Sequence, residues 1–202
     1  MKQLWVLAGG NGSGKSTFYD RYLKDQGLSF VNADNLAKEI SDEMSAKVSQ
    51  SAQEQAMEAC LQKLKDGETF CFETVFSHKS KIELIKKAKS LGYEVNLVFL
   101  HLSLSQLNVA RVSQRVAEGG HDVPQEKIES RIPRSLENIK KAIPLVDNIA
   151  LVDNSSVTDP LKVVVKIKQT KIVYAEKSLP RWADKIIKEL VGKGSLNQDK
   201  IT

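Results

Sequence analysis

The sequence predicts a three-layer α/β/α fold with a mainly parallel five-stranded sheet, followed by a β-hairpin and a last helix. Apolar runs typical of strands alternate with segments of helical periodicity from Leu4 to Val152. Most of the expected helices end at a glycine, which readily adopts the left-handed conformation of a helix C-cap. Alternating strands and helices favour a parallel sheet with helices on both faces.

The first strand and helix enclose the most informative motif of the chain. The run Leu4–Ala8 is apolar and reads as a strand, and Ser16–Gln26 reads as a helix. Between them, Gly9–Thr17 satisfies G-x-x-x-x-G-K-[ST] in the strand–loop–helix order that a phosphate-binding loop needs. Its glycines let successive N–H groups point at phosphate oxygens, and the helix N-terminus adds partial positive charge. We therefore expect a P-loop NTPase fold that binds ATP, or GTP, with Mg²⁺.

The loop residues receive separate expected roles. Lys15 should reach the β- and γ-phosphates, and the Ser16 hydroxyl should hold Mg²⁺. The remaining residues expected to bind the nucleotide are Gly9, Gly10, Asn11, Gly12, Ser13, Gly14, Thr17 and Arg115. A glycine-rich turn without chemical meaning is the alternative, and the strand before the loop argues against it.

The next two strands are expected on either side of a long helix. The run Leu28–Asn32 reads as the second strand. From about Ser45 to Asp66, apolar residues recur at helical spacing, and Gly67 is placed to end that helix. The run Thr69–Phe72 then reads as the third strand.

Two further helices and strands complete the expected sheet. A helix over Lys79–Leu91 ends at Gly92 and leads into a strand over Tyr93–Leu100. A helix over Ser103–Val116 follows, and Ile149–Val152 reads as the fifth strand.

The C-terminal part is expected to lie after the main sheet. Val163–Ile167 and Ile172–Tyr174 read as the strands of a hairpin (163–174), and Pro180–Val191 reads as an amphipathic helix. Before them, Pro133 is expected to kink or restart a helix near Arg131. We predict a single domain over residues 1–192 and a flexible polar tail over 193–202.

Two carboxylates are expected at the edge of the sheet where ligands bind. Ligands in open α/β sheets sit beyond the carboxyl ends of the strands, and Asp34 follows the second strand while Glu73 and Thr74 end the third. Asp34 could take a proton from an attacking hydroxyl, and Glu73 could hold Mg²⁺ or orient substrate beside Thr74. The alternatives are a helix N-cap for Asp34 and a solvent-facing charge for Glu73.

A basic segment over residues 111–134 reads as a lid. Its arginines are Arg111, Arg115, Arg131 and Arg134. Phosphoryl transfer spreads negative charge that arginines stabilise, and Gly119-Gly120 could serve as the hinge of a closing segment. Arg131 and Arg134 are the candidate catalytic arginines, and ordinary surface ion pairs are the alternative. His121 either contacts substrate or caps the turn.

Composition narrows the class of protein. The 202 residues carry a formal net charge of +5, with 27% charged and 41% hydrophobic residues, and no apolar stretch approaches the length of a membrane span. The start enters a strand without a signal peptide, so we expect a cytoplasmic protein. Cys60 and Cys71 read as buried free thiols. A group of lysines on one helix makes a nucleic-acid partner conceivable. No aromatic residues lie between these lysines to stack on bases, which argues against such a partner.

Four motifs in order give the chain a family resemblance. Gly9–Thr17, Asn32–Asn35, Phe72–Ser77 and Gly119–Pro124 together resemble the zeta-toxin family, more closely its chromosomal zeta-like kinases and ATPases. The resemblance spans roughly Leu4 to Asn154. The arginine that family toxins often carry just after the second strand is absent here, and the chain is shorter than the larger toxins.

The resemblance implies an ATP- or GTP-dependent kinase of a nucleotide sugar, typically UDP-N-acetylglucosamine. It implies that Asp34 is the general base, that Glu73 and Thr74 line the substrate site, and that Arg131 and Arg134 bind phosphates. A protein antitoxin is then a possible partner. The alternatives from other classes are a P-loop ATPase switch, a kinase of another small molecule or of a nucleic-acid end, and a non-catalytic partner-binding module with a vestigial loop.

Overall fold

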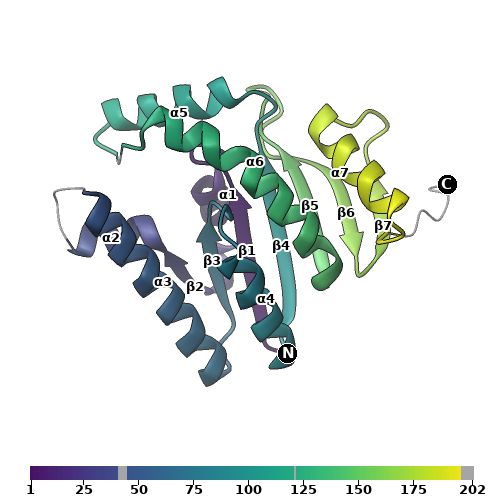
Figure 1. Cartoon of the computed structure of the whole chain (residues 1–202), viewed down its shortest axis with the longest axis horizontal. Helices are drawn as coiled ribbons and strands as arrows, with labels where there is room; N and C mark the ends of the chain where they lie inside the picture. The colour runs from purple at the N-terminus through teal and green to yellow at the C-terminus, as the bar shows by residue number, and fades with distance from the viewer. Residues whose placement is uncertain (41–44, 121, 197–202) are drawn as a thin grey trace.

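The computed structural model describes residues 1–40, 45–120 and 122–196. These residues form a seven-stranded sheet with helices packed against it (Figure 1). The strands are β1 (Gln3–Gly9), β2 (Ser29–Asn32), β3 (Phe70–Thr74), β4 (Glu94–His101), β5 (Asn148–Asp153), β6 (Lys162–Lys168) and β7 (Lys171–Ala175). Their order is β2-β3-β1-β4-β5-β6-β7, and every pairing from β2 to β5 is parallel. The predicted α/β fold with a mainly parallel sheet is confirmed.

The sheet has two more strands than the five predicted, because the hairpin joins it. β6 pairs antiparallel with β5, and β7 pairs antiparallel with β6. Val164, Val165 and Ile167 of β6 become buried in the main core. The hairpin therefore covers what would have been an open edge of β5, where unpaired N–H and C=O groups would remain.

The helices are α1 (Lys15–Tyr22), α2 (Ala33–Ile40), α3 (Ala46–Asp66), α4 (Ser80–Ser90), α5 (Ser105–Ala117), α6 (Gln125–Ala142) and α7 (Arg181–Gly192). Short 3₁₀ helices span Lys24–Gln26 and Ile143–Leu145. The helix predicted over Ser16–Gln26 is thus an α-helix that ends at Tyr22 and a separate 3₁₀ turn. Gly67 ends α3 in the left-handed conformation, with φ of 74°, as the sequence predicts.

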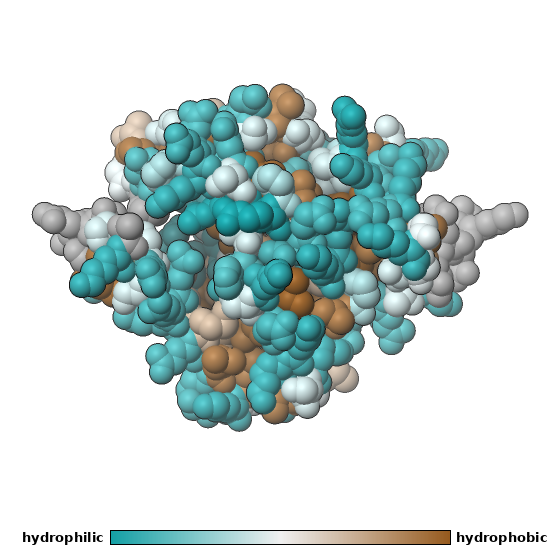
Figure 2. Space-filling model, viewed as in Figure 1, coloured by the Kyte–Doolittle hydropathy of each residue, from teal (hydrophilic) through white to brown (hydrophobic). Residues whose placement is uncertain are grey.

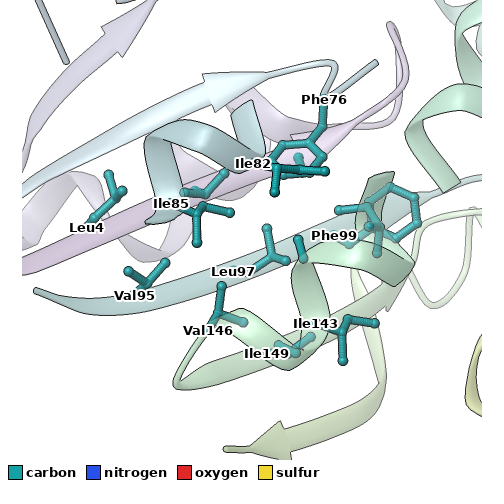
Figure 3. Packing of buried hydrophobic residues seen from close by; sticks show 14 of the residues in the cluster. Leu4, Phe76, Ile82, Ile85, Val95, Leu97, Phe99, Ile143, Val146 and Ile149 are labelled. Carbon is teal, nitrogen blue, oxygen red and sulfur yellow. The ribbon is translucent and has the colours of Figure 1, made fainter. Parts of the chain in front are cut away.

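Two apolar clusters hold the helices to the sheet. The larger cluster packs α3, α4, α6 and α7 on one face of the sheet. Figure 3 shows part of this cluster, with Ile85 of α4 and Ile143 on either side of Leu97 of β4. The smaller cluster packs Phe18 of α1 against Leu7 of β1 on the opposite face. Helices therefore cover both faces of the sheet.

The helix α6 runs without a break through Pro133, so the predicted restart near Arg131 is wrong. Proline removes one backbone hydrogen bond inside a helix, which usually interrupts it. Here Pro133 is exposed, while Ile128 before it and Ile139 after it are buried. Packing on both sides of the proline holds the helix together.

The predicted tail begins inside the fold. Leu196 is buried in the main core, beyond the expected boundary at residue 192. The rest of the predicted tail, 197–202, lies outside the described residues. Among the described helices, none combines the length and the apolar character that crossing a bilayer requires.

Candidate functional site

The candidate site lies at the carboxyl ends of the parallel strands. β1 lies between β3 and β4, so the loop that follows β1 is next to the residues that end β3. β2 pairs with the other side of β3, which brings Asp34 to the same edge. The sequence therefore places its candidate residues around one opening.

The loop after β1 has the shape that binds phosphate. Gly12 and Gly14 have φ of 73° and 95°, a left-handed conformation that other residues rarely adopt. A Cβ atom on Gly14 would lie 2.4 Å from Asn154 Nδ2, so the position also has no room for a side chain. Gly14 is the N-cap of α1, so no side chain at this position accepts a hydrogen bond from the N–H groups of the first turn. The first N–H groups of α1 are thus available to an anion.

Lys15, Ser16 and Glu73 form one polar cluster at the loop. Lys15 Nζ donates a hydrogen bond to Gly10 O at 3.0 Å and lies 3.7 Å from Glu73 Oε1. The Ser16 hydroxyl donates to Glu73 Oε2 at 2.9 Å. Lys15 and Glu73 are both buried. The alternative of a solvent-facing Glu73 is therefore wrong.

The cluster also fits Mg²⁺, which prefers oxygen ligands and usually keeps several waters. Ser16 Oγ and Glu73 Oε2 are two such oxygens, already next to each other. Within the described ranges, no group of three or more His, Cys, Asp or Glu residues could hold a metal ion. Mg²⁺ at this cluster would thus take its other ligands from phosphate and water.

Two buried asparagines, which the sequence analysis missed, support the loop from outside. Asn108 of α5 donates from Nδ2 to Asn11 O at 2.7 Å, and Asn154 donates from Nδ2 to Ser13 O at 2.9 Å. Arg111 Nη2 donates to Asn154 O at 2.9 Å. Arg111 therefore supports the loop through Asn154. A lone asparagine far along the chain gives no local signal of this role.

A cleft of about 340 Å³ opens beside the loop, between α2 and α3 on one side and α6 on the other. Figure 2 shows the surface hollowed there, with mostly hydrophilic residues around the opening. Asp34, Glu73, Thr74 and Arg131 line this cleft together with Lys15. Asn11 lines it as well, so the structure brings together six of the site residues that the sequence predicts.

Asp34 does not cap its own helix. It lies in the first turn of α2, and its backbone N–H donates to Asn32 Oδ1 at 2.7 Å. Asn32 therefore satisfies the helix N-terminus, and the N-cap alternative for Asp34 is wrong. Its carboxylate lines the cleft and is free of that structural task.

The loop after Thr74 is strained and firmly held. Phe76 has a φ of 62°, which is rare for an aromatic residue and costs on the order of 1–3 kcal/mol. Its side chain is buried next to Ile82 (Figure 3), and its N–H donates to Thr74 Oγ1 at 3.1 Å. Two α6 side chains hold the neighbouring carbonyls: Ser135 Oγ donates to Val75 O and Asn138 Nδ2 to Phe76 O. This network fixes one wall of the cleft.

The lid arginines have different surroundings. Arg131 is half-buried and lines the cleft, and its Nη1 lies 3.4 Å from Asn11 Oδ1. Burial lowers the pKa of Arg131, the charge of Arg134 lowers it further, and Asp34 acts in the opposite direction. Arg134 is exposed and donates from Nε to Ser130 O on its own helix.

Arg115 is not among the described residues that line the cleft, although Asp122–Pro124 and Lys127 of the same segment are. Arg115 packs against the predicted hinge, since a Cβ on Gly120 would lie 2.5 Å from Arg115 Cγ. His121 lies outside the described residues, so its predicted contact with substrate stays a prediction.

The buried histidine and cysteines are poorly suited to acid–base or nucleophilic catalysis near pH 7. Burial lowers the pKa of His101 to about 4, so this ring is neutral near pH 7, and it stacks on Phe99. Burial raises the pKa of Cys60 to about 12 and raises the pKa of Cys71 as well. Neither thiol ionises to a nucleophile at that pH.

The sequence matches a family model described as an AAA domain over residues 4–136. A protein from Haemophilus influenzae named only as uncharacterized is 28% identical over 137 residues, which covers 64% of this chain and 97% of that protein.

Solved structures share the fold at low identity. A chain of the AvrRxo1-ORF1:AvrRxo1-ORF2 complex, solved with sulphate ions, matches with a TM-score of 0.68 at 19% identity and covers all of this chain. The same complex solved with ATP gives a TM-score of 0.66. A chain of the PezAT chromosomal toxin–antitoxin system of Streptococcus pneumoniae matches with a TM-score of 0.63 at 16% identity, over 98% of this chain and 86% of that one. This chain spans 66% of the length of the AvrRxo1 chain.

Proposed function

We propose that this chain, which belongs to the AAA domain family, is a nucleotide-dependent phosphotransferase that moves the γ-phosphoryl group of ATP to a small-molecule hydroxyl. One observation carries the proposal. Lys15, Glu73 and Asp34 line one cleft, and the Ser16 hydroxyl is hydrogen-bonded to Glu73. A donor phosphate and an acceptor hydroxyl can meet there.

The proposed reaction assigns each residue a role. The loop N–H groups and Lys15 hold the β- and γ-phosphates, while Ser16 and Glu73 hold Mg²⁺, which neutralises phosphate charge. The acceptor oxygen attacks the γ-phosphorus, the bond to the β–γ bridging oxygen breaks, and ADP leaves. The proton of the acceptor hydroxyl passes to Asp34. Arg131 stabilises the negative charge that spreads over the transferred oxygens.

We propose a nucleotide sugar of the UDP-N-acetylglucosamine type as the acceptor, and a protein antitoxin as a possible partner. The four zeta-like motifs support this choice. The likeness to AvrRxo1 and PezAT supports the fold alone at these identities. A hydrolytic ATPase switch and a kinase of another small molecule or of a nucleic-acid end are the alternatives, and the loop and Asp34 fit them as well.

A donor–acceptor assay tests the proposal. The full chain is incubated with Mg²⁺ and γ-labelled ATP or GTP, with and without UDP-N-acetylglucosamine and other nucleotide sugars. The proposal expects label in a phosphorylated sugar product. Label in inorganic phosphate alone, at equal rates with every acceptor, would favour the ATPase switch instead.

Arg131→Ala should lower kcat more than it raises the KM for ATP, because Arg131 faces the cleft and the loop at Asn11. Arg134→Ala is the matched comparison and should cause a smaller loss, because Arg134 is exposed and hydrogen-bonded to its own helix. Steady-state kinetics of both variants measure the difference. If Arg131→Ala is as active as the unmodified protein, Arg131 does not stabilise the transition state and its role is structural.

A further inference from the structure

The cleft contains a lysine that the proposed reaction does not use. Lys81 is the second residue of α4, and it lines the same cleft as Asp34. It is half-buried, and its Nζ lies 5.6 Å from the centroid of the Phe72 ring on β3. Lys81 therefore belongs to the wall on the α3 and α4 side of the sheet.

Lys81 has no acidic partner among the residues with described positions. The neighbouring cation Lys15 lies against Glu73, whereas exposed lysines of α4 pair outside the cleft, Lys86 with Glu83 and Lys89 with Asp147. Burial lowers the pKa of Lys81, so its charged form is disfavoured there. Burying an ammonium group without a counterion costs free energy. An anion bound next to it in the cleft would offset that cost.

The wall around Lys81 can also satisfy an anion's remaining oxygens. Ser49 and Gln53 of α3 line the same cleft, and both side chains can donate hydrogen bonds. The apolar residues Ala56 and Phe72 also line the cleft. A cation with neutral donors beside it suits a phosphate or carboxylate better than a neutral sugar ring.

We propose that Lys81 binds an anionic group of the acceptor, a phosphate or a carboxylate, and so makes the enzyme selective for anionic hydroxyl compounds. This inference rests on the proposed kinase function. Lys81 acts on acceptor selection, while Asp34 and Arg131 act on the transfer itself.

Kinetics with matched acceptors test the selectivity. N-acetylglucosamine, its 1-phosphate and its UDP derivative differ in charge but share the hydroxyls of one sugar. The phosphorylated forms should be better acceptors, and Lys81→Gln should raise their KM on the order of tenfold or more. The KM for ATP and the kcat should change little. Lys86→Gln, an exposed lysine on the same helix, is the control and should leave every constant unchanged.

A binding measurement keeps the proposal testable if no acceptor turns over. Lysine acetylation read by mass spectrometry should slow at Lys81, and not at Lys86, when N-acetylglucosamine 1-phosphate or gluconate is added without ATP. Protection by the phosphate compound alone, or by gluconate alone, identifies which anion fits. The proposal is overturned if neither anion protects Lys81, or if neutral and charged acceptors react alike and Lys81→Gln leaves their KM unchanged. Protection of Lys81 without any turnover would leave the subsite standing and count against the kinase function.

Discussion

Replacing Asp34 with asparagine should lower kcat by about 10²–10⁴-fold, the usual loss for a missing general base. Asparagine keeps the shape of the side chain but cannot accept the proton of the acceptor hydroxyl. The N-terminus of α2 should remain intact, because Asn32 accepts the hydrogen bond from the Asp34 N–H. ATP affinity and melting temperature should therefore stay close to those of the unmodified protein. Turnover with the acceptor, ATP calorimetry and thermal melting on one preparation measure all three.

Asp20→Asn is the matched control, because Asp20 is an exposed carboxylate on α1 that lies 3.9 Å from Lys24. It should leave turnover unchanged. Near-normal turnover of Asp34→Asn would exclude Asp34 as the base. A large drop in melting temperature would show instead that Asp34 is structural.

The features that the sequence predicts well follow from local motifs and from the order of strands and helices. The loop at Gly9–Thr17 needs glycines, a lysine and a serine at fixed spacing, and a strand and a helix on either side. The convergence of Asp34 and Glu73 follows from parallel strands, whose carboxyl ends meet at one edge. These inferences need no knowledge of distant contacts.

The features that the sequence analysis missed depend on contacts far apart along the chain. Asn108 and Asn154 hold the loop from 97 and 141 residues away, respectively. The strained φ of Phe76 depends on Ser135 and Asn138 of α6. Pro133 stays inside a helix because buried residues on both sides pack against the rest of the protein. Local propensity contains none of this information.

Replacing Lys15 with alanine should remove most ATP binding, because a buried phosphate oxygen would lose its charged hydrogen-bond donor. A hydrogen bond to a charged group is worth about 1.5–3 kcal/mol, which corresponds to a loss of affinity of roughly 10- to 150-fold. Calorimetric titration with ATP measures the change. Lys24→Ala, an exposed lysine in the 3₁₀ helix after α1, is the control and should bind ATP normally.

The Lys15→Ala variant should also be less stable, and a second variant separates that effect from binding. Lys15 and Glu73 are both buried, so removing Lys15 leaves an uncompensated carboxylate, which costs on the order of 3 kcal/mol. The double variant Lys15→Met with Glu73→Gln removes both charges and keeps a hydrogen-bonding side chain near Ser16. Its melting temperature should recover relative to Lys15→Ala, while its ATP affinity should not. Recovery of ATP binding together with stability would mean that Lys15 contributes to the fold and not to phosphate binding, and the assignment of the loop would fail.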